Sequence, residues 1–275
     1  MTIVEVLKLS ADYLQKHGSD SSRLDAELLL AHALNLQRLD LYLKFDRPLG
    51  EPELAAYRAL LARRGKGEPV AYLVGRKEFM GLAFEVTRDV LVPNPDTEVL
   101  VQRAVAIARE TEGPVRVADV GTGSGCIAIS IAHYAPNSEM WASDISPQAL
   151  EVAARNVSRH GLDGRVHLVR GDLMEPFSGK FDLVCANLPY VPAGAALPAE
   201  VTAQPARALY AEDGGAALVA RLLAEAPDRL APGGRVLAEL DPSIVGAVVA
   251  RASDFGGHRL HRDAGGHERV LEAWS

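Results

Sequence analysis

After residue 114, apolar segments alternate with helical stretches, and this alternation restricts the fold more than any other feature of the chain. Six segments are strand candidates, namely 115–120, 139–143, 166–169, 181–186, 234–240 and 268–271. The helical stretches between most of them span 124–133, 147–160, 214–230 and 243–252. Strand–helix alternation predicts a mostly parallel, doubly wound sheet, and hence an α/β fold.

The first 65 residues have a different pattern, in which no strand signal is found. Apolar residues recur there at helical spacing over 3–14, 24–34 and 54–61. Gly18 follows the first of these stretches as a stop signal, and Pro52 is suited to the start of the third. We therefore expect a small helical domain over residues 1–68.

The character of the sequence changes again over residues 69–94. Val70–Val74 and Leu82–Val86 are short apolar runs with glycines between them, which predicts a β-hairpin. We expect this hairpin to be a linker over 69–94, followed by a catalytic domain over 95–275.

Two further segments of the catalytic domain carry local expectations. Asp96 or Thr97 is suited to cap the amphipathic helix that we expect from Val99 onward. Residues 191–213 are rich in Ala and Pro between a strand and a helix, so we predict a mobile loop that faces the substrate.

Length and charge exclude several classes of protein. The 275 residues suffice for one large domain and one small one, and 48% hydrophobic with 24% charged residues is an ordinary globular composition. The net charge is −7, whereas proteins dedicated to binding duplex nucleic acids carry an excess of basic residues, so we expect no direct nucleic-acid partner. We expect no signal peptide, because no basic leader precedes an apolar stretch, and no membrane association, because no run of about 18 apolar residues occurs.

The two cysteines also bear on location. Cys126 and Cys185 both lie in apolar runs, and we expect buried free thiols. Free thiols are typical of a reducing cytoplasm.

The first strand candidate ends in the glycine-rich turn Gly121-Thr122-Gly123-Ser124-Gly125. Three alternate glycines at a strand-to-helix turn let the backbone turn tightly and approach a ligand closely. The spacing G-x-G-x-G differs from the G-x-G-x-x-G fingerprint of dinucleotide sites. A pyrophosphate is therefore disfavoured, and a cofactor with an amino-acid tail is favoured.

Acidic residues end the next two strand candidates. Asp144 ends the second and is predicted to accept hydrogen bonds from ribose hydroxyls, although it could instead only cap the following helix. Asp172 ends the third and is predicted to accept from an adenine amino group while Leu173 packs on the ring; a simple turn is the alternative. A glycine loop and two acids at three successive strand ends form a specific cofactor-binding pattern.

The fourth strand candidate ends in Asn187-Leu188-Pro189-Tyr190. A planar amide or ring amino nitrogen is a poor nucleophile, because its lone pair is delocalised. The side-chain oxygen of Asn187 and the carbonyl of Leu188 would accept from its two N–H bonds, hold it in line with a sulfonium methyl group and take up developing positive charge. Pro189 biases Leu188 toward extended backbone, and Tyr190 offers a face for stacking. The alternative is an ordinary Asn-Pro turn at a strand end.

The remaining candidates are weaker. His258, His261 and His267 lie near the C-terminus without a matching set of carboxylates or cysteines, so we expect solvated loop histidines and no metal site. The arginines and lysines of residues 58–77 are expected to form a solvated face, with contact to a partner as the alternative.

With these residues in place, the chain resembles the peptide chain release factor N5-glutamine methyltransferases, the HemK/PrmC family, over nearly its whole length. The segments that carry the resemblance are Ala71–Gly75, Glu78–Leu82, Val90–Pro93, Pro95–Glu98, the glycine loop with Cys126–Ala128, Asp144–Pro147, and Arg262-Asp263 to Glu268–Val270. The resemblance implies a Rossmann-like methyltransferase domain with S-adenosyl-L-methionine as the methyl donor. It also implies that the acceptor is the glutamine of the Gly-Gly-Gln loop of class-1 peptide chain release factors, held partly by the helical domain. A cytoplasmic monomer is expected.

The resemblance also assigns roles to individual residues. Gly121, Thr122, Gly123, Ser124 and Gly125 would line the cofactor, which Asn187 would also face. Asp144 would take the ribose and Asp172 with Leu173 the adenine. Asn187, Leu188, Pro189 and Tyr190 would clamp the glutamine amide.

The sequence departs from the family pattern at two positions. Leu188 stands where the family has proline, and Asn94 stands where it usually has arginine. Asn-Leu-Pro-Tyr resembles the motif of ribosomal RNA adenine dimethylases, so an N6-adenine methyltransferase acting on ribosomal RNA is an alternative, disfavoured by the acidic charge and the N-terminal helical domain. Two further alternatives are glutamine methylation of another protein, such as a ribosomal protein, and a non-catalytic S-adenosylmethionine-binding protein.

Overall fold

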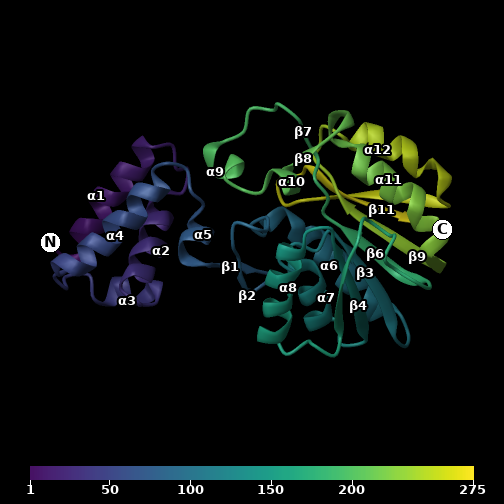
Figure 1. Ribbon diagram of the computed structural model, residues 1–275, viewed down its shortest axis with the longest axis horizontal. Helices are drawn as coiled ribbons and strands as arrows, with labels where there is room; N and C mark the ends of the chain where they lie inside the picture. The colour runs from purple at the N-terminus through teal and green to yellow at the C-terminus, as the bar shows by residue number, and fades with distance from the viewer. The chain divides into compact units, whose positions relative to one another are not determined.

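The chain divides into two compact units with separate cores. The computed structural model describes residues 1–275, apart from the side chain of Asp213. One unit comprises Met1–Arg76 with Ala196–Ala203, and the other comprises Lys77–Ala195 with Gln204–Ser275 (Figure 1). The helical pattern of the first 65 residues and the alternating pattern after residue 114 thus fall in different units.

The first unit is helical, as its sequence pattern predicts. Its elements are α1 (Ile3–Lys16), α2 (Ser22–Ala33), α3 (Arg38–Leu43), α4 (Glu51–Arg64), α5 (Val70–Val74) and the short α9 (Ala199–Thr202). Thr2 and Glu5 form a capping box at the start of α1, and Pro52 occupies the first turn of α4. Leucines from α1, α2 and α4 fill the core. Among the helices that the structure describes, none is long and apolar enough to cross a membrane.

The prediction of a strand over Val70–Val74 is wrong, because this run forms helix α5. Its residues Val70 and Leu73 are buried in the helical core, and Gly75 ends the helix in the left-handed conformation with φ 72°. A short apolar run is compatible with a helix or a strand, and here packing against α2 favours the helix. The two-stranded sheet that follows consists of β1 (Arg76–Phe79) and β2 (Leu82–Glu85).

A buried ion-pair network joins three segments of the helical unit. The Arg64 side chain is 7% exposed and donates from Nε to Asp25 Oδ2 at 2.8 Å. Its Nη2 donates to Glu200 Oε2 of α9 at 2.6 Å. Asp25 also accepts from the hydroxyl of Ser19 at 2.7 Å. The charge of Arg64 is therefore balanced by carboxylates that lie 39 residues before it and 136 residues after it in the sequence.

The second unit is built on a seven-stranded sheet in the order β10-β11-β9-β6-β3-β4-β5. The strands are β3 (Val115–Val120), β4 (Ser138–Asp144), β5 (Val166–Arg170), β6 (Phe181–Ala186), β9 (Leu230–Glu239), β10 (Gly257–Arg262) and β11 (Glu268–Trp274). β3, β4, β5, β6 and β9 run parallel, and β11 is antiparallel to both of its neighbours. All six predicted strands are present, and the predicted α/β, Rossmann-like fold is confirmed. The strand order reverses between β3 and β6, which is where doubly wound sheets bind their ligands.

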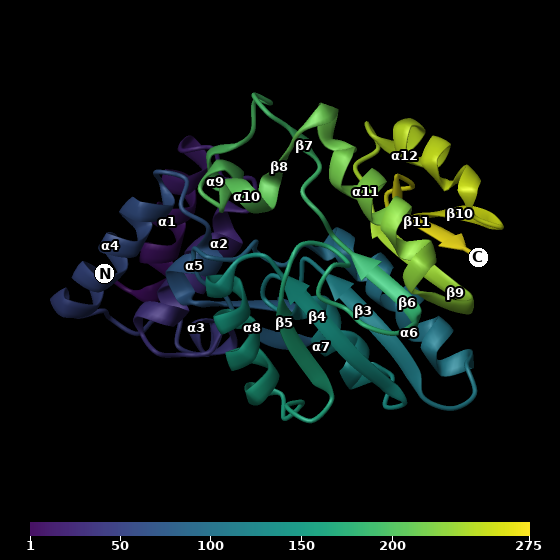
Figure 2. The ribbon, with the colours of Figure 1, turned by 45° about the vertical axis from the view of Figure 1, so that its right-hand side comes forward.

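Helices cover both faces of this sheet (Figure 2). They are α6 (Glu98–Glu110), α7 (Cys126–Tyr134) and α8 (Pro147–Arg159) on one face, and α11 (Ala217–Glu225) and α12 (Val245–Arg251) on the other. Side chains alternate along each strand, so Leu183 and Cys185 of β6 join one core while Val184 and Ala186 join the other. Burial on both faces explains why the central strands β3 and β6 are largely apolar.

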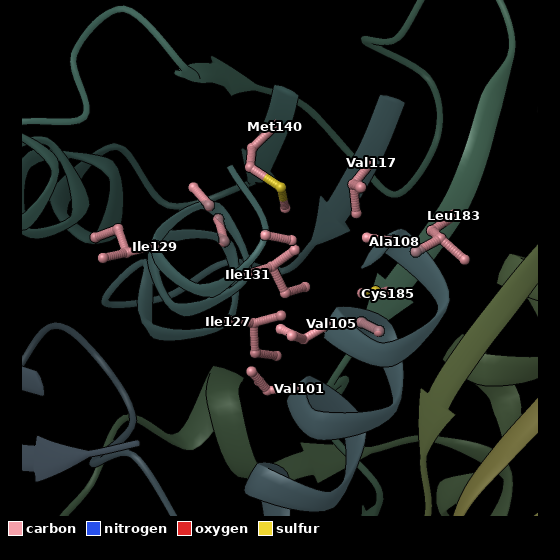
Figure 3. Close-up of a cluster of buried hydrophobic side chains, with 14 of the residues drawn as sticks. Val101, Val105, Ala108, Val117, Ile127, Ile129, Ile131, Met140, Leu183 and Cys185 are labelled. Atoms are coloured by element: carbon pink, nitrogen blue, oxygen red, sulfur yellow. The ribbon is translucent and has the colours of Figure 1, made fainter. Parts of the chain in front are cut away.

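The core on the α6–α7 face is drawn in Figure 3, where side chains of both helices meet those of the strands. The labelled residues are Val101, Val105 and Ala108 of α6, Ile127, Ile129 and Ile131 of α7, and Val117, Met140, Leu183 and Cys185 of the strands. Cys185 and Cys126 are both buried and free, as predicted.

The prediction that His258 and His261 lie in a loop is wrong, because both belong to strand β10. β10 is an edge strand with exposed polar residues, so its sequence lacks the apolar run that marks the other strands. His261 Nε2 lies 2.6 Å from Glu272 Oε2, and that carboxylate also pairs with Arg103 at 2.8 Å and with Arg235. His267 lies beyond the strand and is exposed, as predicted.

Residues 191–213, predicted as a loop, contain four short elements. They are β7 (Val191–Pro192), α9, α10 (Ala206–Leu209) and β8 (Tyr210–Ala211). Pro198 and Pro205 immediately precede the two helices, a position that proline tolerates because it needs no backbone donor there. The segment crosses from the second unit to the first and back, and Val92 N donates to Gln204 Oε1 at 2.9 Å where it returns.

Candidate active site

A cavity of about 670 Å³ lies within the second unit, at the carboxyl ends of the parallel strands. Its volume is suited to a small-molecule cofactor. Ten predicted site residues line it, namely Gly121, Thr122, Gly123, Ser124, Asp144, Asp172, Leu173, Asn187, Leu188 and Pro189. Gly125 and Tyr190 are not among the described residues of this lining. Topology thus brings together residues from four successive strand ends.

The glycine loop has the tight backbone that its sequence predicts. Gly121, Gly123 and Gly125 all have positive φ, at 75°, 56° and 81°. A Cβ on Gly125 would lie 3.0 Å from Ile129 Cδ1 and 3.4 Å from Ala153 Cβ. Gly125 is therefore required for the close packing of α7 against α8 instead of lining the cavity.

A buried carboxylate anchors this loop. Asp119 Oδ2 accepts from the hydroxyl of Thr122 at 2.6 Å and from the amide of Ala128 at 3.1 Å. Oδ1 has no hydrogen-bond partner among the described residues. Burial raises the pKa of Asp119 to about 7, although the two hydrogen bonds oppose this increase.

Because the pKa of Asp119 is higher in the folded chain than in the unfolded chain, its stabilising contribution is complete at low pH. It is lost as the pH rises from about 4 to about 7. We expect Asp119→Asn, which removes the charge and keeps an acceptor, to raise the free energy of unfolding at pH 8 by a few kcal/mol, since each tenfold change in proton affinity is worth about 1.4 kcal/mol. Little change is expected at pH 4.

Urea unfolding at both pH values measures this difference in stability, with the exposed Asp163→Asn as control. Identical pH dependence in the wild type and Asp119→Asn would contradict the expectation.

The two acids of the cavity are held in different ways. Asp144 Oδ2 accepts from Gly123 N and its Oδ1 from Ser146 N, both at 2.9 Å. The side-chain cap of α8 is Ser146, not Asp144, since Ser146 Oγ accepts from Ala149 N at 3.3 Å. Asp172 Oδ2 accepts from Arg221 Nη2 at 2.9 Å.

Leu173 follows Asp172 in a left-handed conformation, with φ 43°. Few residues other than glycine adopt this conformation, which is frequent at ligand sites. Its side chain is buried among the apolar residues on the α11 face and also lines the cavity.

Asn187 is linked to a residue 90 positions away. Its Nδ2 donates to Thr97 Oγ1 at 3.0 Å, and Thr97 is only 2% exposed. Thr97 occupies the N-cap position of α6, as expected, but its side chain makes no capping bond there. Asn94 Oδ1 instead accepts from Asp96 N at 3.2 Å, at the start of the short 3-10 turn that precedes the helix. Thr97 is thus free to bind Asn187 at the cavity.

Leu188 has its side chain in the core, 4% exposed. Its Cδ2 lies 3.1 Å from the position that a Cβ on Gly121 would occupy, so it packs against the glycine loop. Tyr190 is half-buried, and a Cβ on Gly215 would clash with its carbonyl oxygen at 2.0 Å. Burial raises the pKa of Tyr190, which keeps it a neutral phenol.

Several residues of the site have no clear signal in the sequence. Ile145, which is 49% exposed, and Arg221 both line the cavity. Glu239 at the end of β9 is 1% exposed and lies beside Thr97 and Asn187, whose hydrogen bonding lowers its pKa against the effect of burial. The only sequence feature that could have indicated a role for Glu239 is its position as an acid at the end of an apolar strand. Arg221 lies within α11, and no local sequence feature distinguishes it from other surface arginines.

Comparison with known proteins agrees with this geometry. Residues 95–230 match the methyltransferase small domain family, and residues 5–75 match the PrmC N-terminal domain. A solved methyltransferase from Pyrococcus furiosus shares the fold with a TM-score of 0.55 and 22% identity, over 72% of this chain and 91% of that one. The fold is that of a Rossmann-like, S-adenosylmethionine-dependent methyltransferase.

Full-length relatives define the family. The release factor glutamine methyltransferase of Rhodopirellula baltica is 42% identical over 98% of this chain and 95% of its own length. That of Moorella thermoacetica is 38% identical over 100% of this chain and 99% of its own length. This chain belongs to the release factor glutamine methyltransferase family, which confirms the resemblance found in its sequence.

Proposed function

We propose that this protein transfers a methyl group from S-adenosyl-L-methionine to the side-chain amide nitrogen, N5, of the glutamine in the Gly-Gly-Gln motif of class-1 peptide chain release factors. The main observation in support is that Asn187, Leu188 and Pro189 line the same cavity as the glycine loop and the two acids that follow the next strands, Asp144 and Asp172. Donor and acceptor groups can therefore meet in one site. Family membership supports the choice of a release factor as the substrate.

The cavity fits this donor. Its volume and its two carboxylates, Asp144 and Asp172, match a nucleoside with a ribose diol and an exocyclic amine. The left-handed glycines bring backbone close to the amino-acid end. When bound, the cofactor supplies an electrophilic methyl group on a sulfonium. We assign Gly121–Ser124 to its amino-acid part, Asp144 to the ribose, and Asp172 with Leu173 to the adenine.

The chain's own groups hold the acceptor. The Asn187 side-chain oxygen and the Leu188 carbonyl would accept from the two N–H bonds of the glutamine amide, which fixes its orientation and stabilises the charge that develops on nitrogen. Pro189 keeps the Leu188 carbonyl directed by restricting its backbone. Tyr190 adjoins this lining without being part of it, and we propose that its neutral ring stacks on the planar amide when the substrate is bound.

The departure at Leu188 does not decide between an amide and an RNA base. Its side chain is packed in the core, so the group available to an acceptor is its carbonyl, which any residue supplies. The net charge of −7 favours a protein substrate over ribosomal RNA. Methylation of RNA is therefore an outcome that the experiment must be able to detect.

The test offers release factor and ribosomal RNA side by side, with donor labelled on its methyl group. Label is expected on one glutamine of the release factor, and none when that glutamine is replaced by alanine. Label on RNA, or on neither substrate, would overturn the proposal.

Asp144→Ala is expected to weaken donor binding by about 10-fold or more, since hydrogen bonds to a charged group contribute roughly 1.5–3 kcal/mol. The carboxylate also holds Gly123 N, so the loop loses an anchor in the same variant. Calorimetric titration with the donor measures the dissociation constant, and the exposed Asp163→Ala is the control. An unaltered dissociation constant would remove the ribose role.

We further propose that the helical unit holds the release factor. Leu39 and Leu43 of α3 and the nearby Phe45 are 67%, 70% and 56% exposed, and neighbouring exposed apolar residues are typical of interaction sites. Leu39→Ser with Leu43→Ser should raise the KM for release factor several-fold, on the order of 1 kcal/mol or more, while the donor dissociation constant stays the same. Leu9→Ser, at an exposed leucine of α1, is the control. Equal KM values for both variants would argue against this surface.

A further inference from the structure

Glu239 is a buried acid next to the acceptor site that the proposed reaction leaves without a role. It ends β9, and the pairing of Ala238 with Ala186 places it beside Asn187 at the neighbouring strand end. The residue is 1% exposed, and its Oε2 has no hydrogen-bond partner among the described residues. Burying a carboxylate with an unpaired oxygen costs stability, so its position calls for a functional reason.

The hydrogen bonds around Glu239 have a fixed direction. Thr97 has a single hydroxyl hydrogen, and an ionised carboxylate can only accept. The Thr97 hydroxyl therefore donates to Glu239, and its oxygen is left to accept from Asn187 Nδ2 at 3.0 Å. Asn187 also hydrogen-bonds toward Glu239. Thr97 and Glu239 thus both accept from the Asn187 amide nitrogen, Nδ2. The amide oxygen, Oδ1, is then available to a ligand in the cavity.

We propose that Glu239 is a positioning residue, which acts through Thr97 to orient the Asn187 amide with its oxygen toward the acceptor nitrogen. The proposal rests on the proposed function, in which that oxygen accepts an N–H bond of the glutamine. In the flipped amide, Nδ2 would face the donor N–H bonds of the substrate and its oxygen would face the Glu239 carboxylate. Both contacts would be repulsive, so the charge on Glu239 selects one of two otherwise similar orientations.

The charge state of Glu239 makes this selection sensitive to pH. The net pKa of Glu239 is raised to about 7, mainly by burial and in part by the negative charge of Asp96. Hydrogen bonding from Thr97 and Asn187 and the positive charge of Arg269 oppose this increase. Tyr190 faces it as a neutral phenol. A protonated Glu239 can donate to Thr97, whose hydroxyl can then donate to the Asn187 oxygen. The productive orientation is therefore favoured above pH 7 and lost as the pH falls through it.

Variants of Glu239 and Thr97 separate this role from a structural one. Glu239→Gln and Thr97→Val should each lower kcat by about 10-fold or more, as for a misplaced catalytic group, with donor affinity unchanged. Thr97→Ser keeps the hydroxyl and is the matched control, with kcat near that of the wild type. The decline of kcat below pH 7 should disappear in Glu239→Gln. In an Asn187→Ala background, Glu239→Gln should have no further effect, because the residue acts only through Asn187.

A spectroscopic readout keeps the test independent of turnover. The side-chain amide signals of Asn187, assigned by their loss in Asn187→Ala, should titrate near pH 7 in the wild type and not in Glu239→Gln. Amide signals that are the same in the wild type, Glu239→Gln and Thr97→Val would overturn the inference, as would additive losses of kcat in the double variant. If the wild type does not label release factor at all, the proposed function fails, while the amide signals still decide the orientation.

Discussion

Asn187→Ala should lose methyl transfer by about 10² or more while it still binds the donor, because an oriented acceptor of developing charge is removed. The side chain stands at the end of β6, lines the cavity and is held by Thr97 at 3.0 Å. Without it, the Leu188 carbonyl alone would hold the substrate amide, which would then rotate out of line with the methyl group. Single-turnover transfer to release factor measures the loss, and calorimetry measures donor binding.

Asn137→Ala is the control for this substitution. Asn137 Nδ2 donates to the carbonyl of Ala108 at 2.8 Å, away from the cavity, so this variant should lose some stability and keep its rate per folded molecule. Turnover by Asn187→Ala at the wild-type rate would eliminate the proposed clamp. Loss of donor binding in the same variant would instead make Asn187 chiefly a cofactor residue.

The second large effect is expected at Arg64, where alanine should destabilise the helical unit by about 3–5 kcal/mol. The Arg64 side chain is 7% exposed and that of Asp25 is 10% exposed, so removal of Arg64 leaves a buried carboxylate without its counter-charge. The Glu200 contact that ties α9 to this unit is lost as well. Amide hydrogen exchange in α2 and α4 of the full-length protein reports the change in this unit.

The neighbouring Arg63→Ala is the matched control. Arg63 pairs with Glu68 at 2.7 Å, but half of its side chain is exposed, and such surface pairs contribute about 0–1 kcal/mol. Replacing both Arg64 and Asp25 by leucine should recover part of the loss, since no charge is left unpaired. Equal protection in the Arg63 and Arg64 variants would show that burial of the pair does not matter.

The central strands β3 and β6 were predictable because they are buried on both faces and are therefore largely apolar. β10 was not, because an edge strand with exposed His258 and Arg259 depends on pairing with β11. The prediction of a strand over Val70–Val74 is wrong for a related reason. Five apolar residues are compatible with either structure, and only their packing on the helical core selects a helix.

Local sequence patterns identify the glycine loop, the two acids and the Asn187 segment that line the cavity, because each stands at the end of a recognisable strand. Parallel strands bring their carboxyl ends to one edge, so local patterns in successive strands predict a shared site. The side chains that support these residues are set by the packing of the folded chain. Thr97 reaches Asn187 across 90 positions, Arg221 reaches Asp172 across 49, and Glu239 joins by strand pairing. Such contacts depend on the packing of elements far apart in sequence, and no local pattern encodes them.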